Sequence, residues 1–200
     1  MSGNDDRSVP LEPSFYARPA EVVAPGLIGT WIVSTVDGMA AVGRIVEAEA
    51  YIGPHDDASH AAARIGRTRR NQSMYGQPGI AYVYRIYGIH WCLNVVTNAP
   101  DDPAAVLLRA IEPVSGIDSM RRRRRAAADA ALGRGPGNLA RALGITGALD
   151  AHPLDRPPLL IARGQPAGPA AIAIGPRVGI TRARDLPLRF WLRSNPSVSR

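Results

Sequence analysis

The sequence predicts a single domain of mixed α+β class that contains two β-hairpins. Two glycine-containing turns, Asp37-Gly38 and Tyr87-Gly88, each separate runs rich in valine and isoleucine, as is typical of β-hairpins. The 200 residues suffice to bury one core, and neither an internal repeat nor a linker divides them. With 46% hydrophobic residues and one cysteine, Cys92, the composition excludes a disulfide scaffold, a cysteine-rich zinc module and an iron–sulfur cluster.

The first half of the chain contains a predicted helix, a predicted hairpin and a long loop. Residues 1–13 are polar and contain prolines, so we expect a disordered tail that precedes a domain over residues 14–200. Apolar residues at helical spacing predict a helix within 18–28. Strands are expected over 30–35 and 40–50, and a loop over 52–79. A loop of this length inside a compact domain is usually functional or disordered, and we favour function.

The second half contains a second predicted hairpin, a buried strand and two helices. The hairpin strands are expected over 80–86 and 89–97, and a buried strand over 104–112 contains one charge, Arg109, which needs a partner. A helix is expected over 115–132 with Ser115 as its N-cap, and another from Gly135-Pro136 to Gly144. Further short strands are predicted over 172–174, 177–180 and 189–192.

The charge distribution favours a polyanionic partner. All 24 basic residues are arginines, and against 17 carboxylates they give a net charge of +7 and a pI near 10.4. Between Asp57 and Asp101 no carboxylate occurs, whereas arginines alternate with tyrosines and Trp91, as nucleic-acid binding requires. A solvated basic loop beside an ordinary aromatic core is the alternative. Because no lysine is present, no side-chain amine can form a Schiff base.

Other local patterns are less specific. Tyr87 at a hairpin tip could be a wedge between base pairs or could pack on the sheet edge. Glu47 and Glu49 share one strand face and could act as acid and base, although alternating glutamates are also common on exposed strands. The histidines and aspartates of 55–60 match no zinc spacing, so we expect no metal. No apolar run of 18 residues occurs and the N-terminus is charged, so we expect no membrane span and no export, hence a cytoplasmic protein.

Six motifs in this order resemble one known family, that of the alkyladenine (3-methyladenine) DNA glycosylases. They are EAEAYIGPHDDASH (47–60), TRRN (68–71), AYVYRIYG (81–88), LLRAIEP (107–113), GPGNL (135–139) and PRVG (176–179). The resemblance extends from about Phe15 to Ser199. It implies a curved antiparallel β-sheet flanked by short helices, with a protruding hairpin.

The resemblance also implies the activity. Such an enzyme flips an alkylated or deaminated purine out of duplex DNA and hydrolyses its N-glycosidic bond, which leaves an abasic site. The absence of lysine is consistent with a monofunctional enzyme whose nucleophile is water. We therefore expect a DNA repair hydrolase without cofactor or metal, whose partner is double-stranded DNA with damaged purines. It should be a monomer with no obligate protein partner, associated with the nucleoid through DNA.

Individual roles follow from the positions of the motifs. Glu49 would be the general base that activates the water, Arg109 would hold that water and stabilise the carboxylate of Glu49, and the backbone carbonyl of Val178 would contact the same water. The flipped base would lie between Tyr51 on one side and His60 and Tyr84 on the other.

The remaining roles concern base selection and the DNA backbone. Asn94 would disfavour guanine, and Tyr87 would intercalate into the duplex. Four residues of the long loop would lie along the phosphates, namely Arg67, Thr68, Arg70 and Asn71.

Three departures from the family pattern affect these assignments. The stretch 61–64 is about one residue longer, and Asn138 stands where a lysine is often found. A two-residue turn at Tyr87-Gly88 would also place Tyr84 and Asn94 on opposite faces, so a three-residue turn or a bulge is required.

Two other functional classes remain possible from the sequence alone. The first is a catalytically silent binder of damaged or structured nucleic acid, and the second is a small-molecule hydrolase that uses Glu49 and His60. The presence of both Glu49 and Arg109 favours the enzyme over the binder, because a carboxylate in a DNA-binding cavity repels phosphate. The basic, aromatic hairpin disfavours the small-molecule hydrolase.

Overall fold

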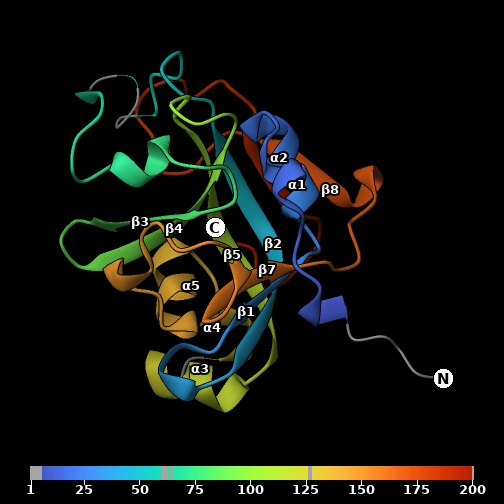
Figure 1. Cartoon of the computed structure of the whole chain (residues 1–200). Coiled ribbons are helices and arrows are strands. Elements are labelled where there is room, and N and C mark those ends of the chain that lie inside the picture. The colour runs from blue at the N-terminus through green and yellow to red at the C-terminus, as the bar shows by residue number, and fades with distance from the viewer. Residues whose placement is uncertain (1–5, 60–62, 64, 126–127, 200) are drawn as a thin grey trace.

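The computed structural model describes residues 6–59, 63, 65–125 and 128–199, in which nine strands form one antiparallel sheet. The strands are β1 (Trp31–Ser34), β2 (Ala41–Tyr51), β3 (Ala81–Ile86), β4 (His90–Thr97), β5 (Ala104–Ser115), β6 (Asp155–Arg156), β7 (Leu159–Ala162), β8 (Ile172–Gly175) and β9 (Arg189–Leu192). Their order is β3-β4-β5-β2-β1-β7-β6, and β9 pairs with both β2 and β8. The predicted α+β fold with a curved antiparallel sheet is confirmed (Figure 1).

Short helices accompany this sheet. The α-helices are α1 (Pro13–Tyr16), α2 (Ala20–Leu27), α3 (Ile117–Arg124), α4 (Asp129–Leu132) and α5 (Pro136–Leu143), and the 3₁₀ turns are η1 (Asp6–Ser8), η2 (Val36–Gly38), η4 (Gln72–Tyr75), η5 (Gly147–Leu149) and η6 (Pro169–Ala171). Figure 1 shows α1 and α2 beside β2, the helices α3 to α5 grouped at the lower left of the view, and the β3–β4 hairpin projecting to the left. Across the described ranges, no helix combines the length and the apolar character needed to cross a membrane.

The two longest strands run through the core. Nearly every residue of β2 and the first eight of β5 are buried, because helices and neighbouring strands cover both faces. β2 pairs with β5 along one edge. Along its other edge, β2 pairs with β1 over its first residues and with β9 at Glu47, Ala48 and Glu49. Glu47 therefore begins the part of β2 that pairs with β9.

The β2–β5 pairing is irregular at this point. Ile45 pairs with Ile111, Glu47 with Ala110 and Ala48 with Leu108, so that Val46 on β2 and Arg109 on β5 have no opposite residue. Such β-bulges redirect side chains and are often found next to active sites. The bulge places Arg109 beside the two glutamates of β2, with which it forms ion pairs.

The register of the β3–β4 hairpin shows how Tyr84 and Asn94 come to lie on one face of the sheet. Ile86 pairs with His90, which leaves a three-residue turn, Tyr87-Gly88-Ile89. In this register Tyr82 is opposite Asn94 and Tyr84 is opposite Cys92, so these four side chains share one face. The sequence-based requirement for a three-residue turn or a bulge is confirmed.

Three local expectations differ from the structure. Where disorder was predicted through residue 13, Pro10 forms a bridge with Ala162, and the Leu11 amide donates to the Ile161 carbonyl at 3.0 Å. The helix predicted over 115–132 is wrong in its extent: Ser115 belongs to β5, Gly116 is the N-cap of α3, and Arg125 at φ 54° ends α3. A left-handed residue is a common helix terminator.

The strand predicted over 177–180 is also wrong. Arg177 and Val178 bind acidic side chains instead of a neighbouring strand, and Gly179 has φ 75°. The other predicted strands and helices occur close to their expected positions, and the loop over 52–79 contains only short turns among its described residues.

Some of the five consecutive arginines, 121 to 125, bind backbone carbonyl groups of neighbouring segments. Arg123 donates to the carbonyls of Val36, Met39 and Ala142, and Arg124 donates to those of Ala131 and Leu132. Arg121 instead forms exposed ion pairs with aspartates. These bonds satisfy carbonyl groups around α3, which the local sequence pattern did not indicate.

Two glycines with the same backbone conformation allow a test of this packing. Gly38 (φ 68°) has open space at its Cβ position, whereas a Cβ on Gly116 (φ 69°) would lie 2.1 Å from the Ala40 carbonyl oxygen. We expect Gly38→Ala to lower the free energy of unfolding by about 1 kcal/mol, through backbone strain alone. Gly116→Ala should lower it by roughly 1–3 kcal/mol more, through steric overlap. Urea unfolding checks both variants, and equal losses would contradict the packing around Gly116.

Candidate active site

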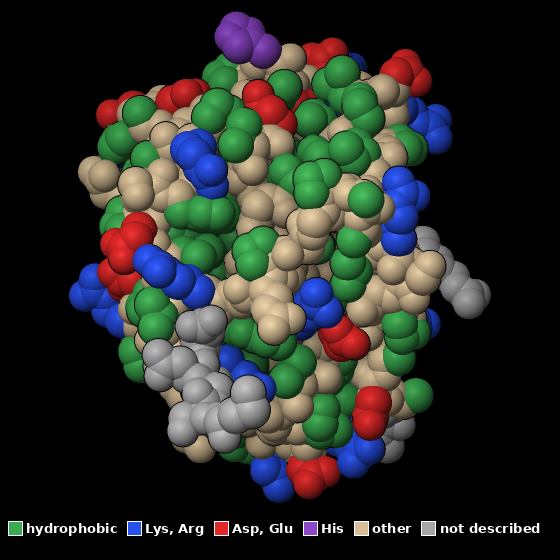
Figure 2. Space-filling model, turned by 90° about the vertical axis from the view of Figure 1, so that its right-hand side faces the viewer, with side chains coloured by type: hydrophobic (Ala, Val, Ile, Leu, Met, Phe, Trp, Pro, Cys, Tyr) green, Lys and Arg blue, Asp and Glu red, His purple; other side chains and the backbone are tan. Residues whose placement is uncertain are grey.

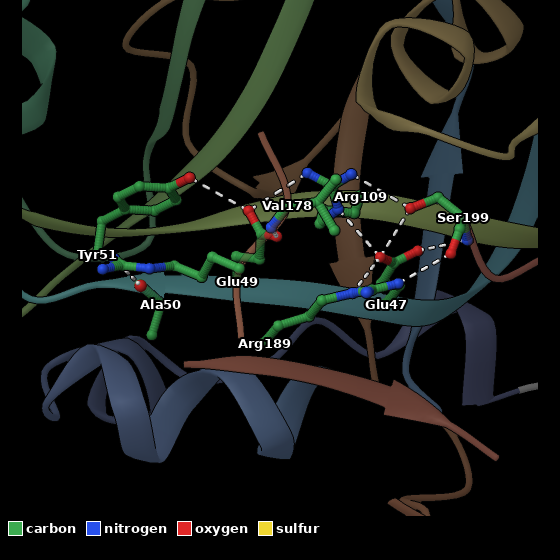
Figure 3. Close-up of polar contacts among 9 residues, drawn as sticks. Glu47, Glu49, Ala50, Tyr51, Arg109, Val178, Arg189 and Ser199 are labelled. Atoms are coloured by element: carbon green, nitrogen blue, oxygen red, sulfur yellow. Dashed lines mark hydrogen bonds and ion pairs between the residues drawn. The ribbon is translucent and has the colours of Figure 1, made fainter. Parts of the chain in front are cut away.

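Glu49, near the end of β2, is a fully buried carboxylate with three donors (Figure 3). Its Oε1 accepts the backbone N–H of Val178 at 2.7 Å. Its Oε2 accepts the Tyr51 hydroxyl at 3.1 Å and Nη1 of Arg109 at 3.3 Å. The donors come from β2, from β5 and from the segment after β8, so the strand pairing and the tertiary fold together position this group.

Burial raises the pKa of Glu49 above its ordinary value of 4.5, because the ionised form loses its hydration. The Arg109 charge and the hydrogen bonds from Val178 and Tyr51 oppose this rise, and the neighbouring Glu47 adds to it. A glutamate with a raised pKa is a stronger base than an exposed one, and such perturbed groups are frequent at active sites.

Arg109, the charged residue in the buried part of β5, has the partners that a buried charge needs. Its Nε donates to Oε1 of Glu47 at 3.0 Å, its Nη1 to Glu49, and its Nη2 to Oγ of Ser199 at 3.2 Å. The predicted pairing of Arg109 with Glu49 is confirmed. Glu47 and Ser199 as additional partners were not foreseen, because they depend on the bulge and on the return of the C-terminal segment to β2.

A second buried ion pair holds the segment that contributes Val178. Both guanidinium ends of Arg177 bind Asp56, with Nη2 at 2.8 Å from Oδ1 and Nη1 at 2.5 Å from Oδ2. Nη1 also donates to the Ala50 carbonyl at 2.9 Å, and the guanidinium lies 4.7 Å from the centre of the Tyr51 ring. Arg177 thus attaches the loop after β2 and the segment after β8 to the strand that contains Glu49. Sequence reasoning did not identify this pair, whose members are 121 positions apart.

The predicted base-pocket residues converge on one face of the sheet. Glu49, Leu107, Asn94 and Tyr82 form a row of paired residues across β2, β5, β4 and β3, so Asn94 shares a face with Glu49. Asn94 is buried and donates to the Tyr82 carbonyl at 3.1 Å. His60, the other predicted stacking residue, lies outside the described residues.

Two tyrosines line the approach to Glu49. Burial raises the pKa of Tyr51, and the nearby Glu49 and Tyr84 raise it further. Burial also raises the pKa of Tyr84, and the thiol of Cys92, which is opposite it in the hairpin, raises it further. Both phenols therefore remain neutral at physiological pH, and their rings are available for stacking.

The hairpin tip is both apolar and exposed. Tyr87 is 85% exposed and Ile89 is 73% exposed, so the alternative that Tyr87 packs on the sheet edge is excluded. At the base of the tip, a hollow of about 540 Å³ is lined by two arginines and four neighbouring residues: Arg70, Arg85, Val83, Tyr84, Gly88 and Trp91. On the face away from the hairpin, Figure 2 shows arginines scattered among acidic and apolar side chains.

The four predicted phosphate-contacting residues differ in exposure. Arg67, Thr68 and Arg70 are exposed, and Arg67 pairs with Asp101 at 2.8 Å. Asn71 is only 3% exposed; its Oδ1 accepts the Thr68 amide at 2.6 Å and its Nδ2 donates to the Gly66 carbonyl at 2.7 Å. Asn71 therefore shapes the loop that presents the other three.

One aspartate of the stretch 55–59 has a structural partner. Asp56 is engaged by Arg177, and within the described ranges no three histidine, cysteine or carboxylate side chains are grouped to bind a metal ion.

Comparisons with known proteins agree with the motif analysis. The sequence profile of the family described as methylpurine-DNA glycosylase matches residues 14–196. A relative from Rhodopseudomonas palustris (strain HaA2) is 48% identical over 95% of this chain and 90% of its own length, and one from Myxococcus xanthus is 46% identical over 95% and 93%. A relative from Carboxydothermus hydrogenoformans is 42% identical over 95% and 98%. Each carries the name of a 3-methyladenine DNA glycosylase.

The buried Asp56–Arg177 pair can be tested against an exposed pair. Asp56→Asn would leave the Arg177 charge buried without compensation, and we expect it to lower the free energy of unfolding by roughly 3–5 kcal/mol. The matched change Asp155→Asn breaks an ion pair with Arg156 whose side chains are 41% and 64% exposed, and it should have little effect. Denaturant unfolding of both variants is the measurement, and equal effects would show that burial does not strengthen the pair.

Proposed function

The chain belongs to the methylpurine-DNA glycosylase family, and we propose that it flips damaged purines out of duplex DNA and hydrolyses their N-glycosidic bonds, leaving an abasic site. The observation that carries this proposal is the buried carboxylate of Glu49, oriented by three donors on the same sheet face as Asn94. It acts, in this proposal, as a monomer on double-stranded DNA with no obligate protein partner.

In the proposed reaction, Glu49 is the general base. The oxygen of a water molecule bonds to C1′ of the sugar, and a proton of this water passes to Glu49. The electron pair of the broken bond between C1′ and nitrogen goes to the purine. A purine that is alkylated at N3 or N7 is cationic in the nucleotide, so it leaves as a neutral base. The raised pKa of Glu49 makes it a better proton acceptor.

Arg109 and Val178 orient this base. Each donates to a different oxygen of Glu49, so the carboxylate plane is fixed before the substrate binds. The positive charge of Arg109 also favours the carboxylate over the protonated acid until the proton arrives. The contribution of the Val178 carbonyl to binding the water remains part of the proposal.

Aromatic rings hold the flipped base. Tyr51 and Tyr84 remain as stacking residues, together with His60 from the family resemblance, because a cationic purine binds favourably between π faces. Asn94, with its amide already bonded to the Tyr82 carbonyl, is fixed at the wall of the pocket, where we propose that it disfavours the exocyclic amine of guanine.

The hairpin and the basic loop bind the duplex. We assign Tyr87 as the wedge that fills the gap left by the flipped nucleotide, since it is exposed on a rigid two-stranded support. Arg67, Thr68 and Arg70 are exposed and are assigned to phosphate contacts, and Arg70 donates to the Arg85 carbonyl of the hairpin at 2.7 Å. Asn71 supports these contacts, in this proposal, through the loop conformation that its hydrogen bonds hold.

Glu49→Gln tests the general-base assignment. We expect the single-turnover release of 3-methyladenine or hypoxanthine from a duplex oligonucleotide to fall by about 10²-fold or more. Binding of the lesion duplex should remain near the wild-type level, and the strand should stay intact unless alkali is added. In the wild type, the rate should decrease as the pH falls through the raised pKa of Glu49, because only the carboxylate accepts a proton. Retained turnover would refute the assignment.

Tyr87→Ala tests the wedge. In a Glu49→Gln background that prevents turnover, we expect its affinity for lesion duplex to fall by about tenfold, because the stacking of one aromatic ring on bases is lost. Tyr87→Phe keeps the ring and should bind like the parent. Fluorescence anisotropy measures both affinities. Unchanged binding by Tyr87→Ala would mean that the exposed ring does not enter the duplex.

A further inference from the structure

A second glutamate is as deeply buried as Glu49 but takes no part in the proposed chemistry. Oε1 of Glu47 accepts Nε of Arg109 at 3.0 Å, Nε of Arg189 at 2.8 Å and Oγ of Ser199 at 2.8 Å. Its Oε2 accepts the backbone N–H of Ser199 at 2.6 Å. Four donors thus surround Glu47, whereas Glu49 has three, whose distances are longer on average. Glu47 is therefore suited to hold a charge in place and poorly suited to bind a reacting water.

The contacts of Glu47 determine how Arg109 lies. A guanidinium is planar, so anchoring two of its nitrogens fixes the direction of the third. Nε of Arg109 is anchored by Glu47, and Nη2 is anchored by Ser199, which itself donates to Glu47. The remaining Nη1 then points at Glu49 (Figure 3).

The charges of the cluster support this division of roles. Arg189, on β9, binds Glu47 through Nε and the Ser199 carbonyl through Nη2 at 2.8 Å. The positive charge of Arg189 offsets the negative charge of Glu47, so the positive charge of Arg109 remains available to Glu49. A buried ion cluster is seldom the most stabilising choice for a core position, which suggests a role in orientation.

We propose that Glu47, held by Arg189 and Ser199, is a positioning residue that directs the guanidinium of Arg109 onto Glu49. This inference rests on the proposed function, in which Glu49 is the base. It extends the active site to β9 and to the C-terminal segment, neither of which contacts the reacting atoms in that proposal.

If Glu47 has this role, the direction in which its removal shifts the pKa of Glu49 can be predicted. The charged and titratable groups that face Glu49 are Arg109 from β5, Glu47 and Tyr51 from β2, and Tyr84 from β3, with Arg177 behind the Tyr51 ring. Of these, Glu47 is the one anion, and it raises the pKa of Glu49. Removing its charge should therefore lower that pKa and weaken the base.

The experiment measures single-turnover base release against pH for two variants of the full chain and one control. For Glu47→Gln, we expect the plateau rate to fall by about tenfold and the acid limb to move to lower pH. Ser199→Ala removes one bond to Glu47 and one to Arg109 without changing a charge. Its rate should fall about fivefold and the acid limb should move to higher pH, because a less well directed Arg109 lowers the pKa of Glu49 less, whereas lesion binding should be unchanged.

Ser197→Ala is the matched control. Ser197 is buried in the same segment, but among the described residues its side chain makes no hydrogen bond to Glu47 or Arg109. It should keep the wild-type rate, and thermal melting of all three variants shows whether each is folded. If Glu47→Gln does not fold, the comparison of the rates of Ser199→Ala and Ser197→Ala tests the proposal by itself.

The possible failures are distinguishable. If Glu49→Gln retains turnover, the proposed function fails whatever the other variants do. If Glu49→Gln is inactive while folded Glu47→Gln and Ser199→Ala keep the wild-type rate and pH profile, the positioning role of Glu47 is wrong. Equal rate losses in Ser199→Ala and Ser197→Ala would also overturn it, because they would reflect the packing of the segment.

Discussion

The shared guanidinium of Arg109 is the interaction on which the rest of the site depends. Placing a cation inside a sheet is unfavourable unless anions and hydrogen bonds surround it, and here Glu47, Glu49 and Ser199 fulfil that need. The strands depart from regular pairing where these groups meet, since Arg109 and Val46 have no opposite residue at that point of the β2–β5 register. The irregularity of the sheet and the chemistry of the site thus have one cause.

Buried ion pairs also hold the irregular segments of the chain against the sheet. Three buried carboxylates, Glu47, Glu49 and Asp56, are matched by three guanidinium groups, Arg109, Arg177 and Arg189. Through these pairs the loop after β2, the segment after β8 and the C-terminal segment are all fastened to β2. Fixed dipoles around a reacting carboxylate need no reorganisation during reaction, so these contacts would preorganise Glu49 for its proposed role as well as support the fold.

The sequence predicted what local patterns encode. Gly38 and Gly88 marked the hairpins, Gly144 marked the end of α5, and a charge in an apolar run showed that Arg109 needed a partner. The partners of Arg177 could not be predicted, because Asp56 is 121 positions away and shares no local periodicity with it. The same limitation produced the wrong strand over 177–180, where a tertiary ion pair overrides β-propensity. Ser115 failed as an N-cap because strand pairing with β2 extends through it.

Glu47 and Glu49 show how one strand can give two identical side chains different roles. Both point to the same face, two residues apart, and both contact Arg109. Glu47 lies where β9 and the C-terminal segment close over β2, and four donors occupy its oxygens. Glu49 lies toward the tyrosines and Asn94, in surroundings that raise its pKa. Environments that differ in this way can separate a structural anion from a base, so the proposed division of roles rests on what covers each residue.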